Sequence, residues 1–314
     1  MPAFTVNRLC ASGLQAIISA AHTIIAGDCD VALAGGVDVM SRAAFFAPAV
    51  RWGQRMGDAA LIDELTGALS DPFHQYHMGV TAENVAKRYG ISREDQDALA
   101  LESQTRAARA IEEGRFKDQI VAVEIKGRKG TVNFDTDEYV RRDAKLSDFT
   151  SLRPAFQKEH GTVTAGNASG INDGAAAVVL ASGEAVRAHG LTPLARLVAY
   201  GYAGVDPAYM GIGPVPATHN ALARAGLSVN DLDVVEANEA FAAQACAVAR
   251  ELGFDSAKVN PNGSGIALGH PIGGTGAIIT TKAVHELHRT GGRLALTTMC
   301  IGGGQGMSAI WERT

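Results

Sequence analysis

Several features that assign a chain to other protein classes are missing from these 314 residues. No uninterrupted apolar run approaches the roughly 18–20 residues that a membrane-spanning helix needs. The N-terminus lacks the basic start and the apolar core of a signal peptide. The net charge of −5 provides no global basic surface for nucleic acid. We therefore expect neither a membrane nor a nucleic-acid partner, and a cytoplasmic location.

Cysteines are few and widely separated. No Cys-x-x-Cys pair indicates zinc or an iron–sulfur cluster, and a chain of this size does not need a disulfide framework. His74 and His77 are three residues apart, but no acidic or cysteine partner accompanies them, so we expect no metal site. A reducing cytosol would keep a nucleophilic thiol usable. The four cysteines are Cys10, Cys29, Cys246 and Cys300, and Cys29 and Cys246 lie in core-like contexts without assigned chemistry.

The patterns that are present predict an α/β protein. Apolar residues make up 46% and charged residues 19% of the chain, which is typical of a folded globular protein. Apolar spacing predicts a helix from Cys10 to Gly27, a buried strand from Val31 that ends in a glycine turn, and a second buried strand over 174–181. Residues 193–314 alternate strands and helices in a largely parallel pattern. Ser92 is expected to cap a helix, and 126–145 to form a surface loop.

Cys10 is the first candidate catalytic residue. It precedes an apolar helix, where the partial positive charge of the backbone N–H groups favours a thiolate over a thiol. Gly13 permits close packing at this loop. Because a free thiol has a pKa of about 8.5 and is mostly protonated at neutral pH, this position predicts an activated nucleophile.

Three further motifs lie far downstream. His270 stands between Gly269 and Pro271, which restrain the backbone as a general base requires. Cys300 follows an apolar strand and precedes Gly302-Gly303-Gly304. A dinucleotide-binding fingerprint needs a helix after its glycines, whereas a strand is predicted here. The glycines therefore indicate a turn whose N–H groups bind an oxyanion. Asn238 suits either a catalytic role or the cap of a helix that begins near Ala240.

Together, Asn-Arg-Leu-Cys-Ala-Ser-Gly at 7–13, Asn-Glu-Ala-Phe at 238–241, Gly-His-Pro-Ile-Gly at 269–273 and Cys-Ile-Gly-Gly-Gly at 300–304 resemble the thiolase family over nearly the whole chain. The resemblance implies that Cys10 carries the acyl group, that His270 is the base, and that Cys300 moves a proton. It implies that Asn238 orients a water and that Gly302 helps to bind an oxyanion.

The resemblance also implies coenzyme A thioesters as substrates and no prosthetic group. The implied substrate-binding residues lie in four places. These are the block around Tyr-His-Met, the cover over the nucleotide, the loop that receives pantetheine, and the acyl pocket. Arg141 is the candidate for an adenine or phosphate contact, with a solvated surface arginine as the alternative. The set is Leu69, His77, Met78, Arg141, Phe156, Ala165, Gly166, Ser169, Met210, Ala240 and Phe241.

The implied fold has duplicated α/β halves in αβαβα layers. Residues 1–40 and 172–192 would form the first half, 41–171 an inserted loop domain over coenzyme A, and 193–314 the second half. Thiolases carry two strands and two helices before the cysteine loop, whereas nine residues precede it here. We therefore expect an N-terminally truncated first half.

Three functions follow from these patterns. The first is an acyltransferase that makes or thiolytically cleaves a 3-ketoacyl-CoA through acetyl-Cys10. The second is a related condensing enzyme, although such enzymes usually have a histidine where Cys300 stands. The third is a truncated, inactive acyl-CoA-binding fragment. Neither the acyl length nor the direction of the reaction follows from the sequence. A homodimer or homotetramer is expected, with 43–58 as a candidate tetramer contact.

Overall fold

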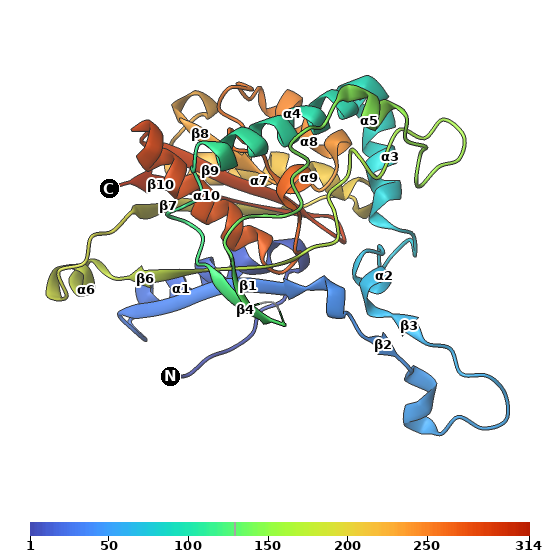
Figure 1. Cartoon of the computed structure of the whole chain (residues 1–314). Helices are drawn as coiled ribbons and strands as arrows, with labels where there is room; N and C mark the ends of the chain where they lie inside the picture. Colours follow the sequence, from blue (N-terminus) through green and yellow to red (C-terminus); the bar gives the residue numbers. More distant parts are fainter. Residues whose placement is uncertain (129) are drawn as a thin grey trace.

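A computed structural model describes residues 1–128 and 130–314, and Lys129, inside the predicted surface loop, lies outside the described residues. Two β-sheets enclose a layer of helices (Figure 1). The first sheet pairs β1 (Val31–Val39) with β6 (Asp173–Ala181) in antiparallel register, from Val31↔Ala181 to Val39↔Asp173. Strands separated by more than 130 residues thus form one unit.

The strand β1 runs straight through Gly35 and Gly36, so the predicted glycine turn after Val31 was wrong. A Cβ on Gly35 would lie 2.4 Å from the carbonyl oxygen of Ala176, and one on Gly36 would lie 2.1 Å from that of Gly273. Gly35 therefore allows close backbone approach within the sheet, and Gly36 allows it between the sheet and the segment before α10, instead of chain reversal.

The two faces of the first sheet differ in burial. Its inner face packs on α1 (Ser12–Ile25), which buries Leu14, Ile17 and Ile18. Its outer face leaves Leu33 64% and Val179 67% exposed, and no helix in the described ranges covers it. The prediction that both strands are buried was therefore wrong for this face.

The second sheet has the order β7-β10-β9-β8. Only the β8–β9 pair is parallel, and β10 pairs antiparallel with both β7 and β9. The predicted largely parallel pattern was wrong because a three-residue glycine turn joins β9 to β10, and such a short connection allows only an antiparallel pair. The strands are β7 (Ala195–Gly204), β8 (Val234–Ala237), β9 (Leu294–Ile301) and β10 (Gln305–Arg313).

Helices pack on both sides of the second sheet. The helix α10 (Thr275–Thr290) contacts β8, β9, β6 and α1, so it lies between the sheets. The helix α7 (Pro214–Ala225) packs on β7 and β10 from the other side, while α8 (Ala242–Leu252) packs on α3 (Met78–Tyr89) and α4 (Arg93–Glu112). Shorter helices are α6 (Gly183–Ala188) and α9 (Gly265–Leu268). No helix in the described ranges is long and apolar enough to cross a membrane.

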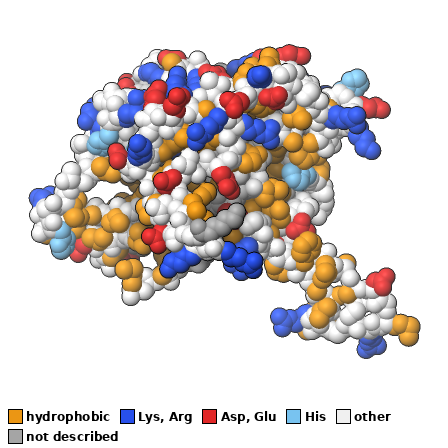
Figure 2. Space-filling model, viewed as in Figure 1, with side chains coloured by type: hydrophobic (Ala, Val, Ile, Leu, Met, Phe, Trp, Pro, Cys, Tyr) orange, Lys and Arg blue, Asp and Glu red, His pale blue; other side chains and the backbone are white. Residues whose placement is uncertain are grey.

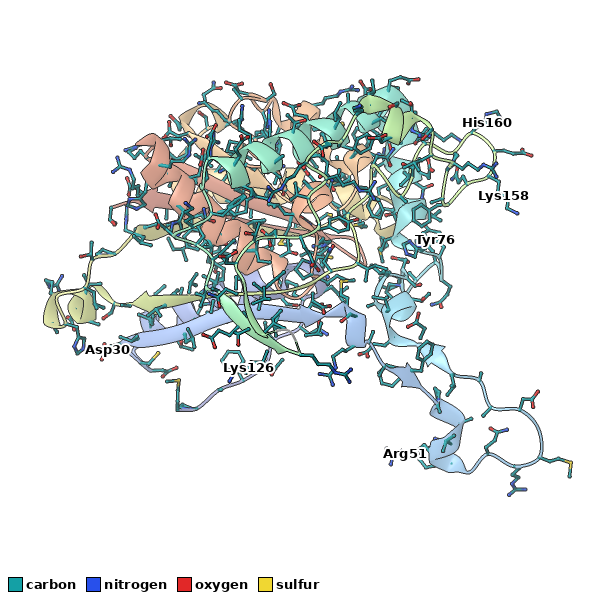
Figure 3. All side chains as sticks on the ribbon, viewed as in Figure 1. Asp30, Arg51, Tyr76, Lys126, Lys158 and His160 are labelled. Atoms are coloured by element: carbon teal, nitrogen blue, oxygen red, sulfur yellow. The ribbon has the colours of Figure 1, made fainter. Side chains whose placement is uncertain are left out.

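The segment between β1 and β6 covers one end of the second sheet and also projects from it. A capping box at Ser92 starts α4, as predicted. The predicted surface loop instead contains a hairpin of β4 (Val123–Gly127) and β5 (Gly130–Phe134), on which Lys126 lies (Figure 3). Alternating Val123, Ile125, Val132 and Phe134 carry the strand signal that the charged residues obscured. The remaining helices here are α2 (Glu64–Ala68) and α5 (Leu146–Thr150).

A projecting arm extends away from the body of the molecule (Figures 1 and 2). It consists of residues 43–63, with β2 (Phe45–Phe46) paired to β3 (Ile62–Asp63) and the 3-10 helix η3 (Pro48–Trp52) beyond them. Arg51 lies toward its far end (Figure 3). Trp52 is 89% exposed and Phe45 63%, so the arm presents large apolar side chains to solvent.

Candidate active site

The N-termini of α1 and α10 meet between the two sheets and bring two of the motifs together. A Cβ on Gly13 would lie 2.7 Å from the backbone nitrogen of Ala277, and one on Gly276 would lie 2.3 Å from that of Leu14. Only glycine permits this approach. Since Cys10 lies just before α1 and His270 just before α10, the contact places both motifs at one end of the helix layer.

Cys10 lies in the short 3-10 helix η1 (Leu9–Ala11), on a bent and locally braced loop. Leu9 has a left-handed φ of 47°, which is unfavourable for a branched side chain. The loop is held because Leu9 N donates to Asn7 Oδ1 at 2.9 Å, and Ser12 Oγ donates to the Leu9 carbonyl at 2.7 Å. This geometry fixes the direction of the Cys10 side chain.

The protonation of Cys10 differs from the sequence-based expectation. Burial raises the pKa of its thiol, and hydrogen bonding from the backbone N–H groups of Gly302 and Cys10 opposes this without reversing it. The charge of Asp38 raises the pKa further. The backbone N–H groups do favour the thiolate, as predicted, but desolvation of the charged form outweighs them. Cys10 needs a base to become a nucleophile.

His270 is held in one neutral form. Thr275 Oγ1 donates its only hydrogen to the Pro271 carbonyl at 2.8 Å, so it accepts from His270 Nδ1 at 2.6 Å. This assigns the proton to Nδ1 and leaves Nε2 with a free lone pair. Burial lowers the pKa of His270 to about 4. The ring is therefore neutral near pH 7, with the Nε2 lone pair available to a proton donor.

Asn238 faces the same imidazole. Its Nδ2 lies 3.4 Å from both ring nitrogens of His270, and its Oδ1 is buried without a partner among the described residues. Asn238 follows β8 directly, and its backbone N–H donates to the Thr298 carbonyl at 3.0 Å. The helix α8 instead begins after Phe241, so Asn238 does not cap it.

Cys300 lies at the end of β9, with no exposed surface. Burial, together with the charge of Cys10, strongly raises the pKa of its thiol. The following glycines turn the chain back, with Gly303 and Gly304 at left-handed φ values of 78° and 86°. A Cβ on Gly302 would lie 3.1 Å from Met78 Cε and 3.3 Å from Leu9 Cδ1. The Gly302 backbone thus lies between the Cys10 loop and α3.

No hydrogen bond joins Cys10 Sγ to either ring nitrogen of His270, although both residues lie in the described part of the chain. Catalytic hydrogen bonds often tighten only when substrate is bound. The structure thus brings Cys10, Cys300 and Gly302 into direct proximity, and His270 and Asn238 into contact with each other, with α1 and α10 joining the two groups.

Most of the predicted binding residues form one apolar cluster beside Cys300. His77 stacks on Phe156 with ring centroids 4.7 Å apart, and Phe156 meets Phe241 edge-on at 6.3 Å. The pantetheine-loop candidate Ser169 donates its backbone N–H to the Ala240 carbonyl at 3.0 Å. Leu69 accepts from the backbone N–H of Met78 at 2.8 Å. The buried members of the cluster include Met78, Met210, Ala240, Phe241 and Cys300.

The other three predicted binding residues lie outside this apolar cluster. Gly166 is buried against Leu152 and Phe149, and Ala165 is exposed. Arg141 is also exposed, and its backbone N–H donates to Gln104 Oε1 at 2.8 Å. Within the described residues its guanidinium group forms no hydrogen bond or ion pair, so it is available to an anionic ligand.

Three site residues were missed by the sequence analysis. Thr275 fixes the tautomer of His270. Asp38 Oδ2 accepts from Gly273 N at 2.9 Å, and Asn172 Oδ1 accepts from His270 N at 3.3 Å. Thr275, five residues after His270 at a helix start, was recognisable as a hydrogen-bonding neighbour. Asp38 lies on β1 and Asn172 just before β6, both distant in sequence from His270, and no sequence signal places them here.

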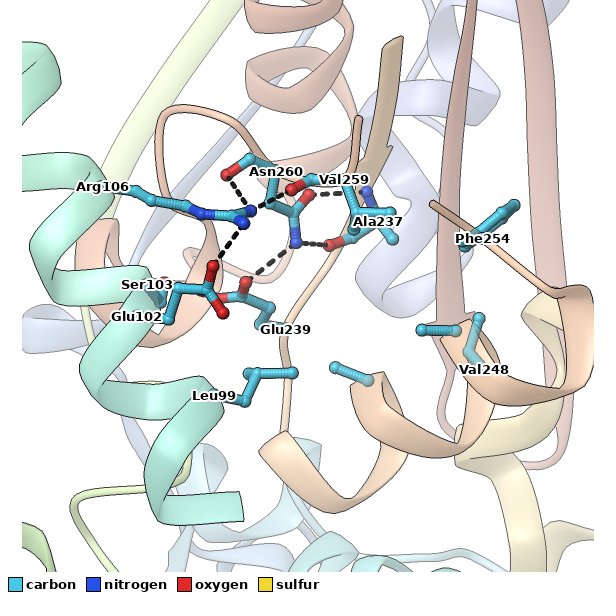
Figure 4. A pocket seen from close by; sticks show the side chains of 12 residues that line it. Leu99, Glu102, Ser103, Arg106, Ala237, Glu239, Val248, Phe254, Val259 and Asn260 are labelled. Carbon is cyan, nitrogen blue, oxygen red and sulfur yellow. Dashed lines mark hydrogen bonds and ion pairs between the residues drawn. The ribbon is translucent and has the colours of Figure 1, made fainter. Parts of the chain in front are cut away.

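A separate cavity of about 70 Å³ lies between α4, α8 and the end of β8 (Figure 4). Leu99, Glu239 and Asn260 are among its lining residues, whereas Cys10, His270 and Cys300 are not. No group of three or more metal-ligating side chains occurs among the described residues. The convergent cysteines and histidine therefore remain the candidate active site.

Comparison with known proteins agrees with this geometry. Residues 1–184 match the family model described as the N-terminal domain of thiolase, and residues 191–313 match that of the C-terminal domain. Beta-ketothiolase BktB of Cupriavidus necator is 70% identical over 312 residues, which are 99% of this chain and 79% of the relative. Acetyl-CoA acetyltransferase of Syntrophomonas wolfei is 53% identical, with the same shares covered.

Solved structures give the same result. The crystal structure of human mitochondrial 3-ketoacyl-CoA thiolase has a TM-score of 0.97 at 49% identity, covering all of this chain and 79% of that one. The same human enzyme in complex with CoA has a TM-score of 0.96 at 48% identity. The chain belongs to the thiolase family, which confirms the resemblance and the fold class predicted from the sequence.

Proposed function

We propose that this chain is an acyl-CoA:acetyl-CoA C-acyltransferase that makes or thiolytically cleaves a 3-ketoacyl-CoA through an acetyl-Cys10 intermediate. The observation that carries the proposal is the meeting of Cys10, Cys300 and the Gly302 N–H group beside a neutral His270. A thiol nucleophile, a base, a proton donor and an oxyanion-binding N–H group are the parts that this reaction needs.

The first step uses Cys10 and His270. His270 Nε2 accepts the proton of the Cys10 thiol, and the sulfur attacks a substrate carbonyl carbon. In synthesis this carbonyl belongs to acetyl-CoA, and the coenzyme A thiolate leaves with the proton of the Cys300 thiol. In cleavage it is the 3-keto carbon, and the bond between C2 and C3 breaks. The backbone N–H groups of Cys10 and Gly302 would stabilise the oxyanion of the intermediate.

The second proton transfer uses Cys300. In cleavage, its thiol protonates the acetyl-CoA enolate that leaves when the C2–C3 bond breaks. A coenzyme A thiol then gives its proton to Cys300 and attacks acyl-Cys10, and Cys10 leaves and takes its proton back from His270. The strongly raised pKa of Cys300 means that the resting enzyme holds the required proton. In synthesis, Cys300 has given this proton to the leaving coenzyme A and then removes the α-proton of a second acetyl-CoA. The resulting enolate attacks acetyl-Cys10, and Cys10 leaves and takes its proton back from His270. Once His270 Nε2 carries the proton taken from Cys10, it and a water on Asn238 would donate hydrogen bonds to the thioester oxygen, so no prosthetic group is needed.

The acyl-CoA would extend from Cys300 along the cluster formed by His77, Met78, Phe156 and Phe241. This cluster is apolar and includes Cys300. Ser169, Gly166 and Ala165 would receive the pantetheine arm, and the exposed Arg141 would contact the nucleotide. Leu69 and Met210 would limit the acyl chain.

The test is thiolysis by the purified chain across a series of 3-ketoacyl-CoA chain lengths, with peptide mass spectrometry after incubation with acetyl-CoA. We expect turnover and an acetyl group on Cys10, and we expect Cys10→Ser to abolish both, since a hydroxyl is a far weaker nucleophile at neutral pH. Cys29→Ser is the matched control, because Cys29 lies between α1 and β1, outside the site. Binding of acyl-CoA without any turnover would instead support the inactive-fragment alternative.

We also propose a homo-oligomer, a dimer or tetramer, in which the projecting arm contacts another copy. Support comes from Phe45, Phe46, Val50, Trp52 and Met56, all more than half exposed on a segment that leaves its own subunit. Light scattering coupled to size exclusion should show a smaller assembly for a Phe45→Ser/Trp52→Ser double variant. An unchanged mass would show that the arm does not contribute to the interface between copies.

The proposed working compartment is the cytoplasm. All four cysteines are unpaired thiols in the structure. The proposed chemistry requires Cys10 and Cys300 to stay reduced, because an oxidised sulfur can neither attack a thioester nor exchange a proton. The reducing glutathione and thioredoxin pools of the cytosol maintain this state.

A further inference from the structure

A buried lysine behind the candidate site joins three chain segments. Lys282 lies on α10, and its Nζ donates to Glu236 Oε2 at 2.7 Å and to the carbonyl oxygen of Gly263. The side chains of Lys282 and Glu236 are only 5% and 0% exposed. One ammonium group therefore links α10, β8 and the loop that follows Val259.

Each of these segments carries one part of the proposed oxyanion site. Glu236 lies on β8, and Asn238 follows two residues later, directly after the strand ends. Thr275, which fixes the tautomer of His270, precedes Lys282 by about two helical turns on α10. Gly263 lies just before α9, which leads into His270. A shift at Lys282 would therefore move these parts relative to one another.

The loop has little freedom to compensate for such a shift. Asn260, at a left-handed φ of 46°, exchanges hydrogen bonds with the backbone of Ala237 and donates to Glu239 Oε1 at 2.8 Å (Figure 4). A Cβ on Gly263 would lie 2.7 Å from Ala107 Cβ. Both ends of this turn are held, so the Gly263 carbonyl oxygen cannot move toward another donor. Its hydrogen bond therefore depends on the position of Lys282 Nζ.

Stability does not explain why a lysine occupies this position. Replacement of a buried ion pair by apolar residues of similar volume is often neutral or stabilising. Here Glu236 Oε1 has no partner among the described residues, and burial raises the pKa of Glu236 to about 7 despite the nearby lysine. The pair is therefore costly to bury, and its remaining effect is to define the geometry of the segments that it joins.

We infer that Lys282, held by Glu236, is a positioning residue that sets the distance between Asn238 and His270. The inference rests on the proposed thiolase function and deepens it. It assigns no contact with substrate to Lys282. The Lys282 ammonium group, buried behind the oxyanion site, keeps Asn238 and His270 at the correct distance from each other.

The experiment compares Lys282→Met with the double variant Glu236→Leu/Lys282→Met. The single variant leaves a buried carboxylate without its partner, whereas the double variant replaces the whole pair by apolar side chains. Arg196→Met is the control, because it breaks the exposed Arg196–Glu312 pair far from the site. The measurements are the melting temperature, kcat and KM for thiolysis of acetoacetyl-CoA, and the ¹⁵N chemical shifts of His270.

We expect Lys282→Met to lower both the melting temperature and kcat. The double variant should regain the melting temperature while its kcat stays low, by up to about 100-fold, as a misplacement of about 1 Å in a catalytic group can cause. KM should stay unchanged, because the acyl-CoA cluster is not touched. The His270 shifts should move in both variants and not in Arg196→Met.

Recovery of wild-type kcat in the double variant would overturn the inference, because the pair would then be purely structural. Unchanged His270 shifts would overturn it as well. If the wild-type chain itself shows no thiolysis, the proposed function fails, but the His270 shifts still decide whether Lys282 positions the imidazole. The two failures are therefore distinguishable.

Discussion

Replacement of Thr275 by valine tests how His270 is made a base. The Thr275 hydroxyl donates to Pro271 O and accepts from His270 Nδ1 at 2.6 Å. Valine has nearly the same shape but no hydroxyl. The variant therefore leaves the Nδ1–H group buried without an acceptor, and it removes the interaction that keeps the lone pair on Nε2.

The expected magnitude follows from the burial of this group. His270 and Thr275 are 5% and 2% exposed, so water cannot replace the lost hydroxyl. A buried polar group without its partner costs about 1–3 kcal/mol. If that cost is carried into the transition state, at 1.36 kcal/mol for each factor of ten, kcat should fall about 5- to 150-fold.

The assay is steady-state thiolysis of acetoacetyl-CoA by Thr275→Val, Thr275→Ser and Thr280→Val. Serine keeps the hydroxyl and should stay close to the wild-type rate. Thr280 is a matched control, because it is equally buried on α10 and its hydroxyl also donates to a carbonyl four residues earlier. A wild-type kcat in Thr275→Val, or an equal loss in Thr275→Ser, would refute the assigned tautomer.

Two further predictions concern pH and packing. The pKa of His270 is about 4 in the folded protein against an ordinary 6.5, so the unfolded chain binds more protons between these values. The free energy of unfolding should therefore decrease by up to about 3 kcal/mol as pH falls from 6.5 to 4, and urea titrations of His270→Asn should lack this component. Gly79→Ala would place a Cβ within 2.3 Å of the Phe156 ring. We expect a loss of about 1–3 kcal/mol of stability and a raised KM for acyl-CoA as Phe156 leaves His77, and a variant with wild-type melting temperature and KM would contradict this.

The sequence by itself determined the family and the candidate reactive residues. Cys10, His270, Cys300 and Asn238 each lie in a short motif whose chemistry depends on immediate neighbours, such as the glycine and proline that flank His270. Local signals also predicted α4 correctly, because the capping box at Ser92 is formed by residues three apart. Information of this kind lies within a few positions of the chain, so a single sequence carries it.

Only the tertiary structure decided how these residues act. Whether Cys10 is a thiol or a thiolate depends on burial by distant segments, which outweighs the helix N-terminus that the sequence displays. The antiparallel pairing of β10 with β7 and β9 follows from long-range register, which local apolar spacing does not indicate. The contact of Lys282 with Glu236 and Gly263 joins residues 46 and 19 positions apart. Such contacts depend on how helices and strands pack, because desolvation and hydrogen bonding act through space and not along the chain.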